Sequence, residues 1–204
     1  MSFEAVPSTP ARTRSVLLGA ALWLAAAFAV GASGIPQKLN PPTPQLVVLI
    51  LTIALISFGR LYAPLHAWIV SVDLRGLVGV HLLRAIAGAA FLWAASRGSL
   101  SSDFARMAGY GDIAVAVLAL AMILLVSPER SSAPLLYVIW NTLGLIDIML
   151  VVITAARMAM SNAPAMAQLL KPSFAIIPLF LVPIVIASHI WIFERLLRRV
   201  GVGR

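Results

Sequence analysis

The sequence contains no cysteine and only seven acidic residues, and charged residues make up 11% of its 204 positions. The absence of cysteine excludes disulfides, thiolate metal sites and cysteine nucleophiles. Soluble domains contain about 25% charged and about 45–50% apolar residues, whereas 61% of this chain is hydrophobic. Because so few polar side chains cannot cover a water-facing surface, the composition predicts a membrane protein, with the lipid bilayer as its first partner.

The formal charge of +8 would also suit a protein that binds nucleic acid. The cations, however, are scattered through short loops and the C-terminal tail rather than grouped in one patch. Cations in loops are the signal that orients membrane proteins. We therefore expect no nucleic-acid partner.

Six segments have the length and apolarity of membrane-spanning helices. The predicted fold class is all-α, a six-helix transmembrane bundle, with a single domain over residues 15–194. A cytoplasmic tail (1–14) precedes the domain, and a basic cytoplasmic tail (195–204) follows it. Between the second and third spans, residues 61–73 predict a short surface helix. The six predicted spans are 15–34, 46–61, 77–95, 113–126, 135–156 and 174–193.

The distribution of lysine and arginine predicts the orientation. With the N-terminus inside, nine cations fall on the cytoplasmic side and five on the outside. We therefore expect a bacterial inner-membrane protein with both termini in the cytoplasm, and a first span that is an uncleaved anchor. The cytoplasmic cations are Arg12, Arg14, Arg60, Arg75, Arg130, Arg195, Arg198, Arg199 and Arg204, and the outer ones are Lys38, Arg97, Arg106, Arg157 and Lys171.

Three predicted spans each contain an ionisable residue well inside them: Arg84, Asp147 and His189. A charge at the bilayer centre costs roughly 2.5–3.5 kcal/mol, so such residues pair with one another or line a polar cavity. The predicted orientation places Arg84 and Asp147 near the middle of the membrane. It places His81, Asn141 and His189 in the inner third. These five residues are therefore the candidate substrate-binding residues.

Two interpretations of these residues are open. In the structural one, Arg84 and Asp147 form a buried salt bridge, and Asn141 and His189 make interhelical hydrogen bonds. In the functional one, which is our leading hypothesis, the protein binds or transports a small solute, with proton coupling. Arg84 would hold an anionic group or balance Asp147, Asn141 would orient the solute, and His189 would carry a proton. This hypothesis needs no enzyme activity, cofactor or metal.

Gly109-Tyr110-Gly111-Asp112 precedes the fourth predicted span. The tetrapeptide resembles the filter of potassium channels, but Met107 and Ala108 replace the Thr and Val of that filter and no pore helix fits before it. We reject that interpretation. The simplest role for the two glycines is a tight turn, with Asp112 as a structural cap of the fourth span.

Two enzyme alternatives also remain. The Gly-x-Gly-Asp pattern resembles intramembrane aspartyl proteases, which would pair Asp112 with a second aspartate such as Asp147. The expected position of Asp112 near the outer face opposes that pairing. Haem ligation by His81 and His189 is the other alternative, because imidazoles are common axial ligands.

The sixth predicted span contains Pro178 and Pro183, and proline removes a helical hydrogen bond and can kink a helix. From residue 73 to the C-terminus, the chain resembles a family of small, uncharacterised bacterial multi-pass membrane proteins. That resemblance implies a list of residues but no activity. It is carried by Arg84, by Gly109–Asp112, by the run Trp140-Asn141-x-x-Gly144-x-x-Asp147 and by the span with Pro178, Pro183 and His189.

Overall fold

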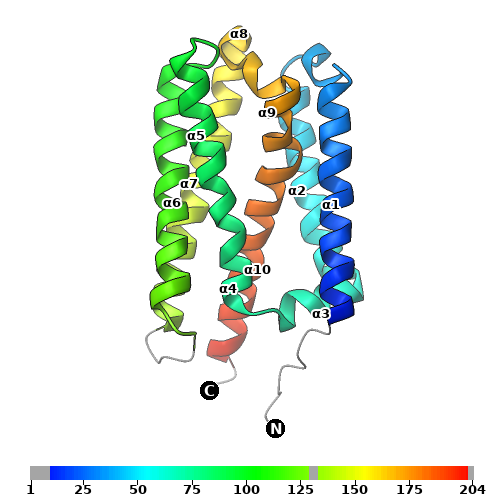
Figure 1. Ribbon diagram of the computed structural model, residues 1–204, viewed down its shortest axis with the longest axis vertical. Helices are drawn as coiled ribbons and strands as arrows, with labels where there is room; N and C mark the ends of the chain where they lie inside the picture. Colours follow the sequence, from blue (N-terminus) through cyan, green and yellow to red (C-terminus); the bar gives the residue numbers. More distant parts are fainter. Residues whose placement is uncertain (1–9, 129–132, 202–204) are drawn as a thin grey trace.

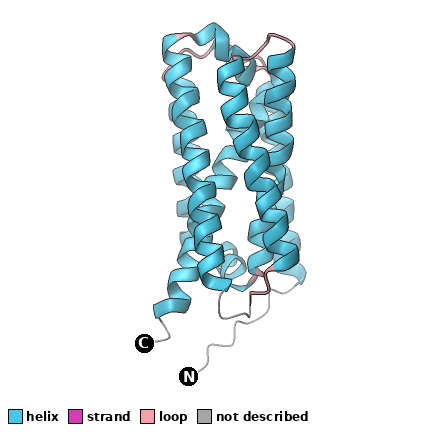
Figure 2. Cartoon of the chain, turned by 90° about the vertical axis from the view of Figure 1, so that its left-hand side faces the viewer, coloured by secondary structure: helices cyan, strands magenta, loops and turns pink. Residues whose placement is uncertain are grey.

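The computed structural model describes residues 10–128 and 133–201. Over these ranges the chain is helical, without strands, and short loops join the helices at the two ends of an elongated bundle (Figures 1 and 2). Six helical runs are long and apolar enough to cross a membrane, which confirms the predicted all-α, six-span fold. They are Arg12–Ala32, Thr43–Leu61, Leu74–Ser96, Ser102–Leu125, Ala133–Ser161 and Pro172–Arg198.

Two of the six spans are composites of shorter elements. The third span combines an α-helix, a 3-10 turn and a second α-helix, and the sixth contains a π-helical turn. The elements are α1 (Pro10–Ala32), η1 (Pro36–Lys38), α2 (Thr43–Leu61), α3 (Ala63–Ser71), α4 (Leu74–Gly79), η2 (Val80–Leu82), α5 (Leu83–Ser96), α6 (Ser102–Leu125), α7 (Ala133–Ser161), α8 (Ala163–Met166), η3 (Ala167–Leu170), α9 (Pro172–Ile176), η4 (Ile177–Leu181) and α10 (Val182–Gly201).

The spans run alternately up and down, so that α1 begins and α10 ends at the same end of the bundle (Figure 1). The short α3 lies at this end as well, where the sequence predicts a short helix. The first two spans are peripheral. In the apolar stretch of each, only 11% of the residues are buried, against 33–50% in the other four spans. The centre of the molecule is therefore a four-helix arrangement of α5, α6, α7 and α10.

Helix α6 begins eleven residues before the predicted start of the fourth span. Ser101 is its N-cap, with a side chain that accepts a hydrogen bond from the backbone N–H of Phe104, as serine commonly does at this position. The predicted turn at Gly109 and Gly111 is wrong, because both glycines lie inside the helix.

Close packing of α5 against α6 explains Gly109. A methyl group at Gly109 would lie 2.9 Å from the carbonyl oxygen of Gly88 and 2.7 Å from Cγ of Leu92. Small residues allow two membrane helices to approach backbone to backbone. Glycine at this position therefore sets the distance between the helices and does not mark a turn.

The π-helical turn η4 interrupts the sixth span between α9 and α10. It contains Pro178, and Pro183 follows two residues after its end. Proline has no N–H and clashes with the carbonyl four residues earlier, so a wider turn accommodates it. The predicted local distortion is thus present as a π-helical turn, a feature that is frequent at functional sites.

A layer of polar side chains separates the two larger of three apolar cores in the described part of the chain. One core contains Phe91, Phe104 and Val185, and the other contains Leu77, Tyr137 and Ile192. Along each of the four central spans, the polar residues fall between the stretches that build the two cores. We call this group the polar layer, and its members are His81, Arg84, Asp112, Asn141, Asp147, Ser188 and His189.

Candidate functional site: the polar layer

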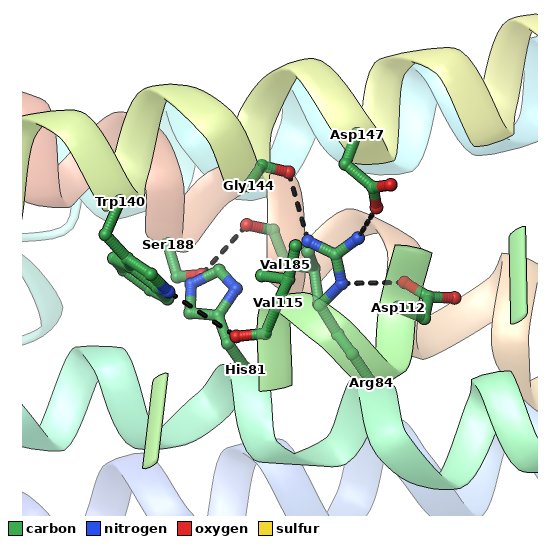
Figure 3. A network of polar contacts seen from close by, with 9 residues as sticks. All are labelled: His81, Arg84, Asp112, Val115, Trp140, Gly144, Asp147, Val185 and Ser188. Atoms are coloured by element: carbon green, nitrogen blue, oxygen red, sulfur yellow. Dashed lines mark hydrogen bonds and ion pairs between the residues drawn. The ribbon is translucent and has the colours of Figure 1, made fainter. Parts of the chain in front are cut away.

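Arg84 is the second residue of α5, and its side chain is 1% exposed. Its Nε donates to Asp112 Oδ1 at 2.7 Å, and its Nη1 donates to the carbonyl oxygen of Gly144 at 3.0 Å. Its Nη2 donates to Asp147 Oδ2 (Figure 3). The rigid fork of donors in a guanidinium suits such multiple pairing. One arginine side chain therefore joins α5, α6 and α7.

Asp112 is an ion-pair partner within the bundle and not a cap. The prediction that it caps a span near the outer face is wrong, because α6 begins ten residues earlier, about 15 Å along the helix axis. Its side chain is 3% exposed. The missed signal was the polar run from Ser101 to Asp103, which is typical of a helix start.

Asp147 projects from α7 into the seam with α6. Its side chain is 21% exposed, so it is less enclosed than the side chains of Arg84 and Asp112. Its carboxylate lies against Gly111, where a methyl group would overlap Asp147 Oδ1. The lack of a side chain at residue 111 therefore makes room for the carboxylate.

The ion cluster of Arg84, Asp112 and Asp147 holds one cation and two carboxylates. If both carboxylates are ionised, the three side chains sum to a charge of −1. An uncompensated charge inside a protein is costly. One bound proton, or one positive charge on a ligand, would neutralise the cluster. Its composition therefore leaves a place for one exchangeable positive charge.

His189 is held in one tautomer by Asn141. Asn141 Nδ2 donates to the backbone carbonyl of His189 at 3.0 Å, so its Oδ1 is the acceptor that faces His189 Nδ1 at 2.8 Å. His189 therefore carries its proton on Nδ1. Its Nε2 is buried, makes no hydrogen bond within the described residues and presents a lone pair.

His81 is held in the opposite tautomer by Ser188. The hydroxyl of Ser188 donates to the carbonyl oxygen of Val185 at 2.8 Å, so it accepts from His81 Nε2 at 3.0 Å (Figure 3). The lone pair of His81 is then on Nδ1, which is buried and has no hydrogen-bond partner in the described part of the chain. Each imidazole thus offers one basic nitrogen to the interior.

The two imidazoles adjoin the ion cluster. The ring centroids of His81 and His189 are 4.1 Å apart, and Trp140 packs against both. The edge of the His189 ring that carries Cε1 and Nε2 lies against Gly144. A methyl group on Gly144 would be 2.7 Å from His189 Cε1 and 3.1 Å from His189 Nε2. The carbonyl of Gly144 accepts from Arg84. Gly144 therefore connects the imidazole pair to the ion cluster.

The structure brings together the five residues that the sequence proposed as substrate-binding: His81, Arg84, Asn141, Asp147 and His189. Asp112 and Ser188 join them, and neither was in that set. Ser188 could have been suspected only from its position beside His189 in a span. A substrate-binding role for the group stays a prediction.

Neither enzyme alternative fits this geometry. Direct contact between His81 and His189 leaves no space for a porphyrin between two axial ligands, so the haem interpretation is wrong. Asp112 and Asp147 do converge, but Arg84 stands between them and donates to both (Figure 3). An aspartyl dyad instead shares a proton between its carboxylates. Across the described ranges, no three His, Asp or Glu side chains are grouped to hold a metal ion.

The fold and the polar layer define an all-helical membrane protein with a buried arginine–aspartate cluster. The chain belongs to the family described as Domain of unknown function (DUF8737), whose model matches residues 41–197. This stretch includes every member of the polar layer and leaves out α1. The match confirms the resemblance to an uncharacterised family. No curated protein and no solved structure matches the chain.

Proposed function

We propose that this protein binds a small solute at the polar layer and transports it with an exchangeable proton. The observation that carries the proposal is the unequal charge count of the ion cluster, in which two carboxylates face one guanidinium. Polar groups at this depth are costly and commonly mark substrate or proton pathways. An exchangeable positive charge there gives the protein a way to couple two binding events.

The roles follow from the contacts. The proton resides on Asp112 or Asp147, which share the guanidinium of Arg84. Asn141 orients His189, whose lone pair on Nε2 accepts the proton when it leaves the carboxylates. A protonated Nε2 of His189 would lie next to the backbone of Gly144 and compete with Arg84 for its carbonyl oxygen. The position of the proton would then determine which contacts Arg84 makes.

We also propose a location and an orientation. The excess of lysine and arginine on one side of the sequence-derived topology supports a multi-pass protein of a bacterial inner membrane, with both termini in the cytoplasm. In that orientation α3 lies at the cytoplasmic side. The imidazole pair then lies between the cytoplasm and the ion cluster, as a proton relay requires.

A structural role is the second candidate, because the contacts of Arg84 hold three helices together. In that case the cluster would keep one fixed protonation state and nothing would exchange. The two candidates therefore differ in one measurable property, the exchange of a proton at the ion cluster, and exchange requires that the resting cluster holds a proton.

Infrared spectra of the protein in lipid at neutral pH test whether the resting cluster holds a proton. We expect one buried carboxylic acid band, which disappears in Asp112→Asn or in Asp147→Asn. The exposed Asp103, which pairs with Arg106 at the surface, provides the matched control Asp103→Asn and should leave the band unchanged. A wild-type spectrum in which both carboxylates are ionised would contradict the proposal.

Transport is tested in proteoliposomes that contain a pH-reporting dye. Panels of neutral, anionic and cationic small solutes are added outside, and the lumen pH is followed. A solute-dependent pH change in wild type and Asp103→Asn that is lost in Asp112→Asn and Asp147→Asn supports coupling. Absence of any such change in folded protein, or its persistence in both variants, overturns the transport part of the proposal.

A further inference from the structure

A cavity of about 480 Å³ lies at the end of the bundle opposite the start of α1, where η1, α8 and η3 join the spans. We call it the apolar chamber. Its volume falls within the range of about 300–1,000 Å³ that is usual for small-molecule sites. Its walls come mainly from α2, α7, α8, η3 and the π-helical turn, and include Gln45, Val48, Val151, Ala155, Ile177 and Pro178.

The lining of the chamber is aliphatic and aromatic apart from one end. Among the described residues that line it, none is charged. Its polar side chains are three amides, Gln37 of η1, Asn40 of the loop that follows it, and Gln45 at the start of α2. A charged ligand group would find no ionic partner in these walls. The chamber is thus built for an apolar body with a neutral polar head.

Gln45 shows where such a head would bind. Its Oε1 is buried and has no hydrogen-bond partner within the described ranges. An unpaired buried amide oxygen costs about 1–3 kcal/mol. A hydroxyl group can both donate and accept, so it would pair with this amide in either orientation of its oxygen and nitrogen.

The far end of the chamber adjoins the polar layer. A small void of about 10 Å³ lies at Arg84 and Asp112, close to the volume that one water molecule requires. The chamber and this void are lined in part by the same four side chains, which form a thin partition. These side chains are Phe91, Val151, Ile177 and Val182.

The π-helical turn positions this partition. Ile177 begins the turn and Val182 follows it directly, and Pro178 within the turn lines the chamber. A π-helical turn widens a helix locally and occurs often at functional sites. The distortion of the sixth span thus lies where the two cavities meet.

We propose that the apolar chamber binds a lipid-soluble alcohol, an uncharged amphiphile whose hydroxyl pairs with Gln45 and whose apolar body extends to Phe91 and Val182. The inference rests on the proposed function in one respect, since it names the class of solute that occupies the chamber beside the polar layer before transport. Its physical basis is separate, because it depends on the shape and lining of the chamber and not on the ion cluster.

Photolabelling of the full-length protein in nanodiscs tests the proposal. Three probes share one alkyl chain with a diazirine near its end and differ only in the head: a hydroxyl, a carboxylate or a trimethylammonium. We expect the alcohol to label the segments around Phe91 and Val182 at least tenfold more than either charged probe. Equal labelling by the three heads indicates ordinary lipid partitioning and overturns the proposal.

Two chamber variants examine the two parts of the site. Ala155→Phe fills the chamber and should abolish labelling by the alcohol. Gln45→Leu removes the hydrogen bond to the head and should weaken binding roughly three- to tenfold, which is the size expected for a neutral hydrogen bond. Ile153→Phe is the matched control, since Ile153 is an exposed residue of α7 that does not line the chamber. Labelling that is unchanged in Ala155→Phe contradicts the proposal.

The same probes separate this inference from the proposed function. Asp112→Asn and Asp147→Asn should lose the carboxylic acid band but keep alcohol labelling, because neither carboxylate contacts the head. If labelling is lost in Ala155→Phe and weakened in Gln45→Leu while the carboxylic acid band of both variants persists, the alcohol site is supported independently. If the wild type has the band but the alcohol never labels it, the ligand class is wrong and the proton site stands.

Discussion

The carboxylate of Asp147 occupies the space that a side chain at Gly111 would fill. A methyl group built on Gly111 overlaps Asp147 Oδ1, and Asp147 Oδ2 accepts from Arg84. A glycine of α6 therefore determines whether an aspartate of α7 reaches its arginine on α5. Asp112, the next residue after Gly111, pairs with the same arginine.

Gly111→Ala should weaken the ion cluster. The added methyl group forces the carboxylate of Asp147 away from Arg84, and overpacking of this kind costs about 1–3 kcal/mol. The measurement is the free energy of unfolding in detergent, followed by helical circular dichroism. Gly19→Ala is the control, because nothing lies within 4 Å of a methyl group there and alanine favours a helix by up to about 1 kcal/mol. Equal effects of the two substitutions would contradict the packing argument.

Arg84→Leu should destabilise the protein by about 3–5 kcal/mol, because it leaves two carboxylates buried without their partner. Adding Asp112→Asn and Asp147→Asn to the same chain removes that charge. The triple variant should therefore be more stable than Arg84→Leu alone, as unfolding free energies would show. A triple variant that is less stable than the single one would show that the charge count is not what Arg84 balances.

The sequence was sufficient for the number of spans and for the grouping of most of the polar residues, because span length and the spacing of charges are local properties. It was insufficient at Asp112, since a glycine pair has the same local pattern whether it forms a turn or lets two helices touch. The difference lies in the contact of Gly109 with Gly88 and Leu92, which a single chain pattern does not contain.

Only one of the two ion-pair partners of Arg84 could be predicted from the sequence. Similar expected depths in the membrane paired Arg84 with Asp147, and that pair is present. The second pair, with Asp112, depends on the rotation of α6 against α5. Similarly, Pro178 predicted a distortion of the sixth span without predicting a π-helical turn. The apolar chamber results from the meeting of α2, α7, α8, η3 and that turn, so no segment of the sequence predicts it alone.

His81 and His189 should be neutral imidazoles in opposite tautomers. The contacts place the proton of His81 on Nε2, facing Ser188, and that of His189 on Nδ1, facing Asn141. Nitrogen-15 chemical shifts of the labelled imidazoles distinguish the two forms. In Asn141→Leu the acceptor for His189 is lost, so we expect the proton of His189 to move to Nε2 while His81 is unchanged. Identical tautomers in the wild type would contradict the assigned network.

Phe91→Ala should open the partition between the apolar chamber and the ion cluster. Phe91 is 2% exposed and lines both cavities, and its truncation should cost about 3–5 kcal/mol. An apolar carbodiimide reacts with carboxyl groups that it can reach through lipid, so it should label Asp112 faster in Phe91→Ala than in the wild type.

Phe28→Ala, which changes an exposed residue of α1, is the control and should leave the rate of labelling at Asp112 unaltered. Because a general loosening of the fold would also speed exchange of backbone amides in α1, amide exchange there must stay at its wild-type rate. An unchanged rate at Asp112 in folded Phe91→Ala protein would mean that Phe91 does not separate the two spaces.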